Sequence, residues 1–160
     1  MSSTGHPPIL GTESLVWSDE GDCAATAARL ASHAGLRRAF IELHGPLGAG
    51  KTTFVRHLLH ALGVPGRIKS PTYAVMEPYE LPGGDAWHFD FYRFDDPQEW
   101  EDAGFRDVFA SPGLKLVEWP EKADGLLPRP DLRIAIAIDD DDRRHVGVAA
   151  LSELGRELLS

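Results

Sequence analysis

The sequence predicts an α/β fold in which a mixed, mainly parallel β-sheet is flanked by helices and carries antiparallel hairpins. Three observations support this prediction. A predicted strand, Phe40 to Leu43, leads into a glycine-rich loop and then a helical stretch. A second apolar strand, Leu114 to Val117, is followed by an acidic residue. Apolar residues alternate from Leu132 to Ile138, before a run of aspartates and a further strand-like segment, which is typical of a hairpin.

The N-terminal part is expected to hold a tail, a strand and a helix. Residues 1–13 contain Gly, Pro, Ser and Thr without periodicity, so we expect a flexible tail followed by a single domain over residues 14–160. A four-residue strand should come first in that domain. A helix should then start near Ser18, because polar and acidic side chains suit a first turn, and Gly35 should end it after Ala34.

The loop after the strand Phe40 to Leu43 matches the phosphate-binding P-loop pattern G-x-x-x-x-G-K-[ST]. Its glycines let successive backbone amides point towards phosphate oxygens. Lys51 would contact the β- and γ-phosphates, and Thr52 would offer its hydroxyl to Mg²⁺. The following helix adds the positive end of its dipole and should end at Gly63. We therefore expect nucleotide binding by Gly45, Leu47, Gly48, Ala49, Gly50, Lys51, Thr52 and Thr53.

The middle and the end of the chain are expected to add two hairpins and two short helices. Tyr73 to Tyr79 and Ala86 to Tyr92 have strand composition and flank a Pro-Gly-Gly turn, which predicts an antiparallel pair. Asp96 followed by proline is typical of a helix start, and this helix should reach Ala103. A terminal helix is expected over residues 152–159.

Three further residues are candidates for catalysis. A P-loop enzyme needs an acidic group that binds Mg²⁺, directly or through water, or that orients the attacking water. Glu118 follows an apolar strand and is the first candidate, with Asp90 the second. Thr72, in a Ser-Pro-Thr sequence, could be a switch residue whose contacts depend on the γ-phosphate. Each has a structural alternative: an exposed strand end for Glu118, a turn or helix cap for Asp90, and an ordinary loop hydroxyl for Thr72.

Three side chains are expected to have supporting roles. Trp119, beside the first acidic candidate, is expected to pack in the core. His88 is expected to support the loop around Asp90. Cys23, the single cysteine, excludes an intramolecular disulfide and should be a small buried packing residue.

Composition limits the partners. The net charge is −9, and residues 85–107 hold eight acidic residues, so stable DNA binding is not expected. If the protein serves a process that involves nucleic acid, it would act through protein partners. An equal alternative is that the acidic stretch is simply a solvated surface. No apolar run suits a membrane span or a secretory signal, which favours the cytoplasm. The chain contains no Asn and hence no guanine-reading N-K-x-D motif, which favours ATP.

Four segments in order along the chain resemble the bacterial TsaE (YjeE) family: Leu47 to Phe54, Lys69 to Tyr73, His88 to Arg93 and Leu116 to Pro120. The resemblance implies a Mg²⁺-dependent ATPase of tRNA threonylcarbamoyladenosine modification. It also implies weak activity alone, dependence on the TsaB–TsaD pair, and contact with tRNA only through that complex. Carried over, Lys51 and Thr52 hold phosphate and Mg²⁺, and Glu118 is the Walker-B-like acid. Asp90 then belongs to an HxD motif important for turnover, and the loop with Thr72 is a switch.

Two other functions stay open from the residues alone. A small-molecule P-loop kinase would need an acceptor pocket and usually an arginine-bearing lid, and the sequence has no compact lid insertion. A nucleotide-gated binding module would bind ATP without useful hydrolysis. No arginine lies in a motif that marks an arginine finger, although Arg67, Arg93 and Arg106 are local candidates.

Overall fold

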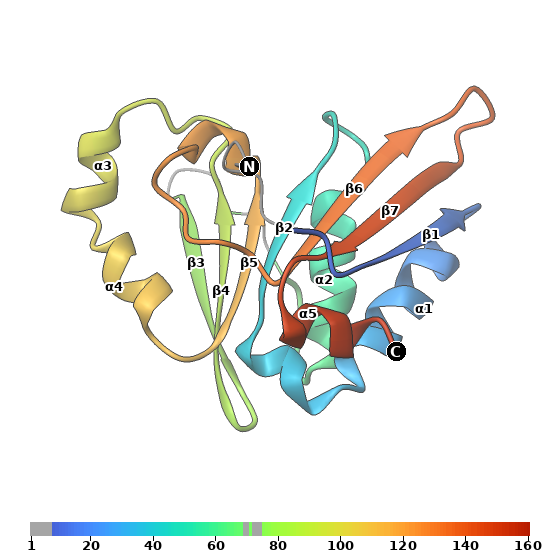
Figure 1. The fold of residues 1–160 in the computed structure, drawn as a ribbon, viewed down its shortest axis with the longest axis horizontal. Coiled ribbons are helices and arrows are strands. Elements are labelled where there is room, and N and C mark those ends of the chain that lie inside the picture. The colour runs from blue at the N-terminus through green and yellow to red at the C-terminus, as the bar shows by residue number, and fades with distance from the viewer. Residues whose placement is uncertain (1–7, 69–70, 72–74) are drawn as a thin grey trace.

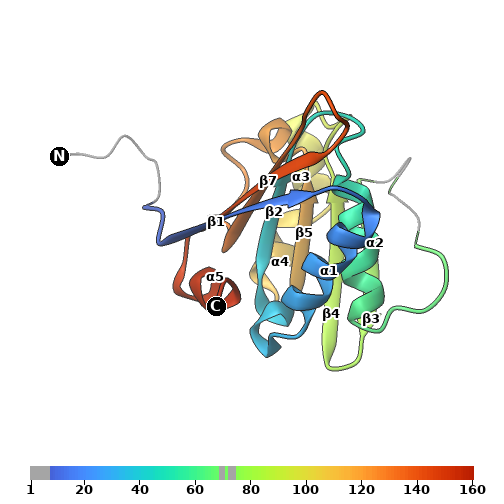
Figure 2. The same ribbon diagram turned by 90° about the vertical axis from the view of Figure 1, so that its right-hand side faces the viewer.

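The computed structural model describes residues 8–68, 71 and 75–160, which form one seven-stranded sheet with helices on both faces (Figures 1 and 2). The strands are β1 (Gly11–Trp17), β2 (Phe40–His44), β3 (Met76–Leu81), β4 (Gly84–Asp90), β5 (Leu114–Glu118), β6 (Leu132–Ile138) and β7 (Arg144–Ala150). The helices are α1 (Glu20–Ala31), α2 (Lys51–Ala61), α3 (Pro97–Asp102), α4 (Phe105–Ala110) and α5 (Glu153–Leu158), with 3₁₀ turns η1 (Ala34–Arg38) and η2 (Pro120–Ala123).

The sheet confirms the predicted fold class. Its strand order is β1-β7-β6-β2-β5-β4-β3, and β2 runs parallel to both of its neighbours, β5 and β6. β4 is parallel to β5, while β3 and β4, β6 and β7, and β1 and β7 pair antiparallel. The parallel strands bring their carboxyl ends to one edge, where Glu118 is in register with both Leu43 and Asp90. The loop after β2 therefore starts beside both acidic candidates.

Alternating side chains divide the core between the two faces of the sheet. Leu114 and Leu116 of β5 belong to the cluster beneath α1 and α2, whereas Val117 belongs to an aromatic cluster that includes Trp100 of α3 and Phe105 of α4. Figure 2 shows α1 and α2 together on one side of the sheet and α3 and α4 on the other. Because strand side chains alternate, Glu118 points to the same face as Leu116, towards α2.

Two N-terminal boundaries differ from the predictions. β1 starts at Gly11, which pairs with Ala150, so residues 11–13 lie in the sheet and not in the expected tail. α1 ends at Ala31 rather than Ala34, and Gly35 lies inside η1. The tighter turn buries Leu36 completely in the core, and this packing could not be read from the alanine stripe.

The central hairpin and the helices after it also differ in detail. The expected first strand overlaps residues 73 and 74, which lie outside the described residues, and β3 is described from Met76. β4 ends at Asp90, because the Asp90 carboxylate accepts a hydrogen bond from the Tyr92 amide (3.0 Å) and so turns the chain. α3 is capped by Asp96 as expected, while α4 was not predicted. No helix among the described residues is long and apolar enough to cross a membrane.

Candidate nucleotide-binding site

The P-loop joins β2 to α2 and requires glycine at several positions. A Cβ on Gly45 would lie 2.7 Å from the Ile136 carbonyl oxygen of β6, so only glycine fits there without a shift. Gly48 and Gly50 have φ angles of 79° and 108°, in the left-handed region. Gly50 is the N-cap of the eleven-residue α2 and supplies no side-chain acceptor. The first amides of α2 are thus left for an anion.

The Lys51 ammonium is held at the centre of the loop. Its Nζ donates to the Gly45 carbonyl oxygen (2.5 Å) and lies 3.5 Å from the centre of the Trp119 ring. Burial lowers the pKa of Lys51, and the negative charges of Glu118, Glu121 and Asp90 oppose that shift. Trp119 packs only half-buried against the aromatic cluster, so the expectation of a purely core residue is wrong.

Glu118 connects the P-loop to the sheet. The Thr52 hydroxyl lies 3.0 Å from each carboxylate oxygen of Glu118, and the His88 Nε2 lies 2.6 Å from Oε2. Glu118 is only 2% exposed, which excludes the alternative of an exposed strand end. The sequence predicted that His88 supports the loop around Asp90, but its side-chain contact is with Glu118. Within the described part of the chain, His88 Nδ1 is the buried side-chain polar atom without a hydrogen-bond partner.

Asp90 lies beside Glu118 and is half-buried. Burial raises the pKa of Asp90, and the neighbouring Glu118 charge raises it further, while the hydrogen bond from Tyr92 acts in the opposite direction. Asp90 therefore has a turn-forming contact and also borders the site. Thr72, the predicted switch residue, lies outside the described residues.

An arginine that the sequence did not indicate holds the P-loop from β7. Arg144 donates through Nε to the Ala49 carbonyl oxygen (3.2 Å) and through Nη2 to the Gly48 carbonyl oxygen (3.0 Å). It lies 95 residues from Ala49 in sequence. Arg144 reaches the P-loop because the strand order places the β6–β7 hairpin beside β2. The earlier candidates Arg67, Arg93 and Arg106 are exposed and do not line the site.

These side chains surround a cavity of about 290 Å³. It is lined by Leu47, Gly48, Ala49, Gly50, Lys51, Thr52, Thr53, Asp90, Tyr92, Glu118, Trp119 and Arg144. The described residues contain no group of three or more His, Cys, Asp or Glu that could hold a metal by itself. A hydroxyl and a carboxylate are nevertheless the oxygen ligands that Mg²⁺ accepts together with phosphate oxygens, so Thr52 and Glu118 fit that ion.

Comparisons with known proteins identify the family. Residues 17–146 match the family described as threonylcarbamoyl adenosine biosynthesis protein TsaE. The tRNA threonylcarbamoyladenosine biosynthesis protein TsaE of Haemophilus influenzae is 42% identical over 120 residues, which cover 75% of each chain. The protein of the same name from Bacillus subtilis is 36% identical over 111 residues, 69% of each chain.

A solved structure agrees with the sequence comparisons. The crystal structure of Bacillus subtilis YdiB superposes with a TM-score of 0.76 at 26% identity, covering 93% of this chain and 92% of YdiB. The family match spans most of the chain and includes β2, the P-loop, β4 and β5, which carry the site. This chain belongs to the TsaE family.

Proposed function

We propose that this chain is the ATP-binding and ATP-hydrolysing subunit required for tRNA N6-threonylcarbamoyladenosine modification, and that it acts with the TsaB–TsaD complex. One observation carries the proposal: Lys51, Thr52 and Glu118 meet at a P-loop, in a chain that belongs to the TsaE family. In the tRNA modification, the acidic chain would reach tRNA only through its partners. Its lone buried Cys23 suits a cytoplasmic protein.

The residues have distinct roles in this proposal. The amides at the start of α2 and the Lys51 ammonium bind the phosphates, and Thr52 with Glu118 would hold Mg²⁺. The metal, when bound, neutralises charge on the phosphate oxygens. Asp90, whose pKa is raised, would orient the attacking water or accept its proton. Water attacks the γ-phosphorus, the bond to the β–γ bridging oxygen breaks, and ADP, phosphate and a proton leave.

Phosphate release from ATP, measured with and without purified TsaB–TsaD, tests this function. We expect slow turnover by the chain alone, a faster rate with the partners, and no turnover by the Lys51→Ala variant. Modified tRNA should form only in a complete mixture that includes this chain. Transfer of the phosphoryl group to a small molecule would instead identify a kinase. ATP binding that controls partner affinity, with no release above the Lys51→Ala background, would identify a binding module.

A further inference from the structure

Four consecutive aspartates, residues 139–142, form the turn between β6 and β7, and the first of them differs from its neighbours. The side chain of Asp139 is 21% exposed, compared with 87% for Asp142. Hydrogen bonds from the Arg143 amide and the His145 ring lower the pKa of Asp139 to about 2, so it is ionised at neutral pH. Asp139 is therefore engaged by the protein rather than by solvent alone.

Asp139 folds the turn through both of its carboxylate oxygens. Oδ1 accepts hydrogen bonds from the backbone amides of Asp141 (2.9 Å) and Arg143 (3.0 Å), which are contacts typical of an aspartate that begins a turn. Oδ2 lies 3.2 Å from the Arg143 Nε and 2.7 Å from the His145 Nε2. The Asp139 carbonyl oxygen also accepts a hydrogen bond from the Asp142 amide (3.1 Å). One residue thus fixes the path of the chain from β6 to β7.

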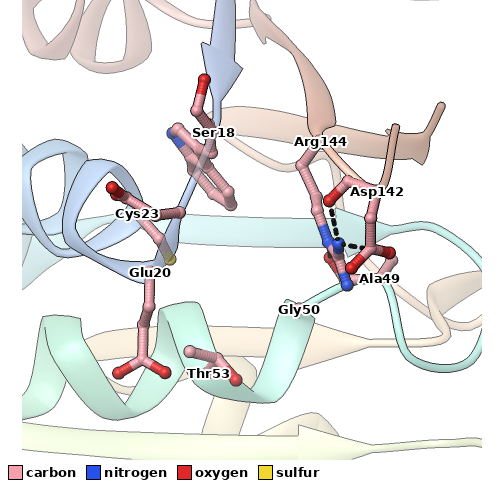
Figure 3. A pocket seen from close by; sticks show the side chains of 10 residues that line it. Ser18, Glu20, Cys23, Ala49, Gly50, Thr53, Asp142 and Arg144 are labelled. Atoms are coloured by element: carbon pink, nitrogen blue, oxygen red, sulfur yellow. Dashed lines mark hydrogen bonds and ion pairs between the residues drawn. The ribbon is translucent and has the colours of Figure 1, made fainter. Parts of the chain in front are cut away.

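Asp142 connects this turn to Arg144. It has a φ angle of 64°, a left-handed conformation that aspartate adopts more readily than most residues. Its carbonyl oxygen accepts a hydrogen bond from the Arg144 Nη1 (2.6 Å), and its Oδ1 lies 3.1 Å from the same nitrogen. Figure 3 shows both contacts, with the Arg144 side chain directed towards Gly50 of the P-loop. The turn therefore holds one side of the guanidinium group.

The other side of the guanidinium group holds the P-loop. Nε of Arg144 donates to the Ala49 carbonyl oxygen and Nη2 donates to the Gly48 carbonyl oxygen, so all three nitrogens are used. Because a trans peptide unit is planar, its N–H points away from its C=O. Holding the Ala49 carbonyl towards the hairpin therefore directs the Gly50 amide away from it. Amides arranged in this way are the groups with which a P-loop binds phosphate.

Resting on the proposed function, we propose that Asp139 is a positioning residue for binding of the nucleotide phosphates. It acts through the turn that it folds, which sets the Arg144 guanidinium against the P-loop. The alternative is an acidic turn that only keeps the surface solvated. A carboxylate without a positioning role repels the anionic nucleotide, so its removal would leave ATP binding unchanged or slightly stronger. The proposal predicts the opposite sign.

Amide hydrogen exchange of the nucleotide-free protein tests the positioning without ATP. Asp139→Ala removes both carboxylate oxygens, and we expect exchange of the P-loop amides, residues 45–52, to become about two- to tenfold faster. Asp140→Ala removes an exposed carboxylate of the same turn and should leave this exchange unchanged. Arg143→Ala should also leave it unchanged, because the backbone amide still donates to Asp139 Oδ1. Parent-like exchange of the P-loop in Asp139→Ala would overturn the inference.

ATP binding and turnover give a second test, with a conservative variant. We expect Asp139→Ala to weaken Mg²⁺–ATP binding about three- to tenfold in calorimetry, and to raise KM with little change in kcat, because ground state and transition state lose the same contacts. Asp139→Asn keeps an oxygen for the two backbone amides and should restore most of the affinity. Asp140→Ala is again the control. An equal loss in Asp139→Asn and Asp139→Ala would show an effect of charge and contradict the role of the turn.

A double-variant cycle shows whether Asp139 acts through Arg144. In an Arg144→Ala background, Asp139→Ala should change the ATP affinity by less than about twofold. If its full effect persists there, Asp139 acts by another route and the inference is wrong. Thermal unfolding checks each variant, and all should fold because Asp139 belongs to neither core cluster. If the parent protein binds no Mg²⁺–ATP, the proposed function fails, whereas the exchange experiment still decides whether Asp139 orders the P-loop.

Discussion

At the scale of single residues, the buried Lys51 ammonium allows a direct test of phosphate binding by the P-loop. Replacing it by alanine removes the cation that would contact the β- and γ-phosphates. Charge-assisted contacts of this kind contribute on the order of 1.5–3 kcal/mol each, so Lys51→Ala should weaken ATP binding roughly 10- to 150-fold in calorimetry. Lys122→Ala, on the exposed surface of η2, is the matched control. An unchanged affinity in a folded Lys51→Ala protein would contradict the P-loop assignment.

Glu118 tests turnover rather than binding. Glu118→Gln keeps the side-chain shape and an acceptor for Thr52 and His88, but removes the charge that would support Mg²⁺. We expect ATP to bind while the hydrolysis rate falls by roughly 10²-fold or more, and the Mg²⁺ dependence of the rate should change. Glu121→Gln on η2 removes a nearby exposed carboxylate and serves as the control. Equal rates and equal Mg²⁺ dependence in Glu118→Gln and the parent would move the acidic role to Asp90.

Asp90 links stability to pH with a defined sign. Its pKa is raised above the ordinary 3.8 in the folded state, so ionisation of Asp90 destabilises the fold. This penalty is absent below the unfolded-state pKa and is complete above the raised folded-state pKa. Asp90→Asn should therefore increase the thermal unfolding temperature at pH 7, and the difference should disappear as the pH approaches 3.8.

The same Asp90 variant should lose ATP hydrolysis, because asparagine cannot accept a proton from water. A gain in stability with a loss of activity is the pattern expected of a functional residue. Asp107→Asn, on the exposed face of α4, is the comparison for an ordinary surface carboxylate. An unfolding temperature for Asp90→Asn that is lower than the parent's at pH 7 would rule out the destabilising role of the charge.

At the scale of elements, the β6–β7 hairpin supports the P-loop through Arg144. We expect Arg144→Ala to weaken ATP binding about tenfold and to increase hydrogen exchange at the P-loop amides, because two carbonyl contacts are lost. Arg144→Lys should not restore binding, since only the planar guanidinium can donate from Nε and Nη2 together. Arg143→Ala removes the neighbouring exposed arginine as a control. If Arg144→Ala bound ATP with the affinity of the parent and showed the same hydrogen exchange at the P-loop amides, the β6–β7 hairpin would have no role in the site.

The elements that the sequence predicted best are those with strong local signals. The P-loop, its strand and α2 follow from glycine spacing and capping, and Asp96 caps α3 through the Gln98 amide as its sequence indicates. α4 was missed because Gly104, which normally marks an end, here adopts φ 71° between two short helices. The end of α1 depends on the burial of Leu36, which is a tertiary effect.

The site was predictable where it depends on local sequence and unpredictable where it depends on strand order. Glu118 was found because it follows an apolar strand, and Asp90 because it is an acidic residue near the end of the expected strand Ala86 to Tyr92. Their mutual register, and the contact between His88 and Glu118, require that β4 and β5 be neighbours. Arg144 has no motif at all and depends on a pairing that joins distant parts of the chain.

At the scale of the whole molecule, we expect a protein partner to control hydrolysis. Among the described residues, the arginine that lines the cavity beside the P-loop is Arg144. Its guanidinium already donates to the carbonyl oxygens of Gly48 and Ala49, so it is not free to act as an arginine finger. A group supplied by a partner can contribute about 10³–10⁵ in rate. TsaB–TsaD should therefore accelerate phosphate release by this chain. Full-speed turnover by the isolated chain, with no effect of the partners, would contradict this.

The switch residue can be tested in the same assay. Thr72→Ala should reduce the acceleration by TsaB–TsaD more than it weakens ATP binding, because a switch contact matters mainly in the assembled state. Ser111→Ala, far from the P-loop in sequence and absent from the cavity, is a hydroxyl-removal control. Equal partner stimulation in Thr72→Ala and the parent would make Thr72 an ordinary loop residue.

The pairing of β1 with β7 also affects how the protein emerges from the ribosome. β1 is translated first among the strands, yet its partner in the sheet is the last, from Gly11 opposite Ala150 to Trp17 opposite Arg144. Until β7 leaves the exit tunnel, β1 has no strand to pair with and β6 has an unpaired edge. While the P-loop is already outside, the nascent chain therefore exposes an unpaired strand, β1, and the free edge of β6. The loop is translated well before β7, so Arg144 can secure it only after β7 has also been made.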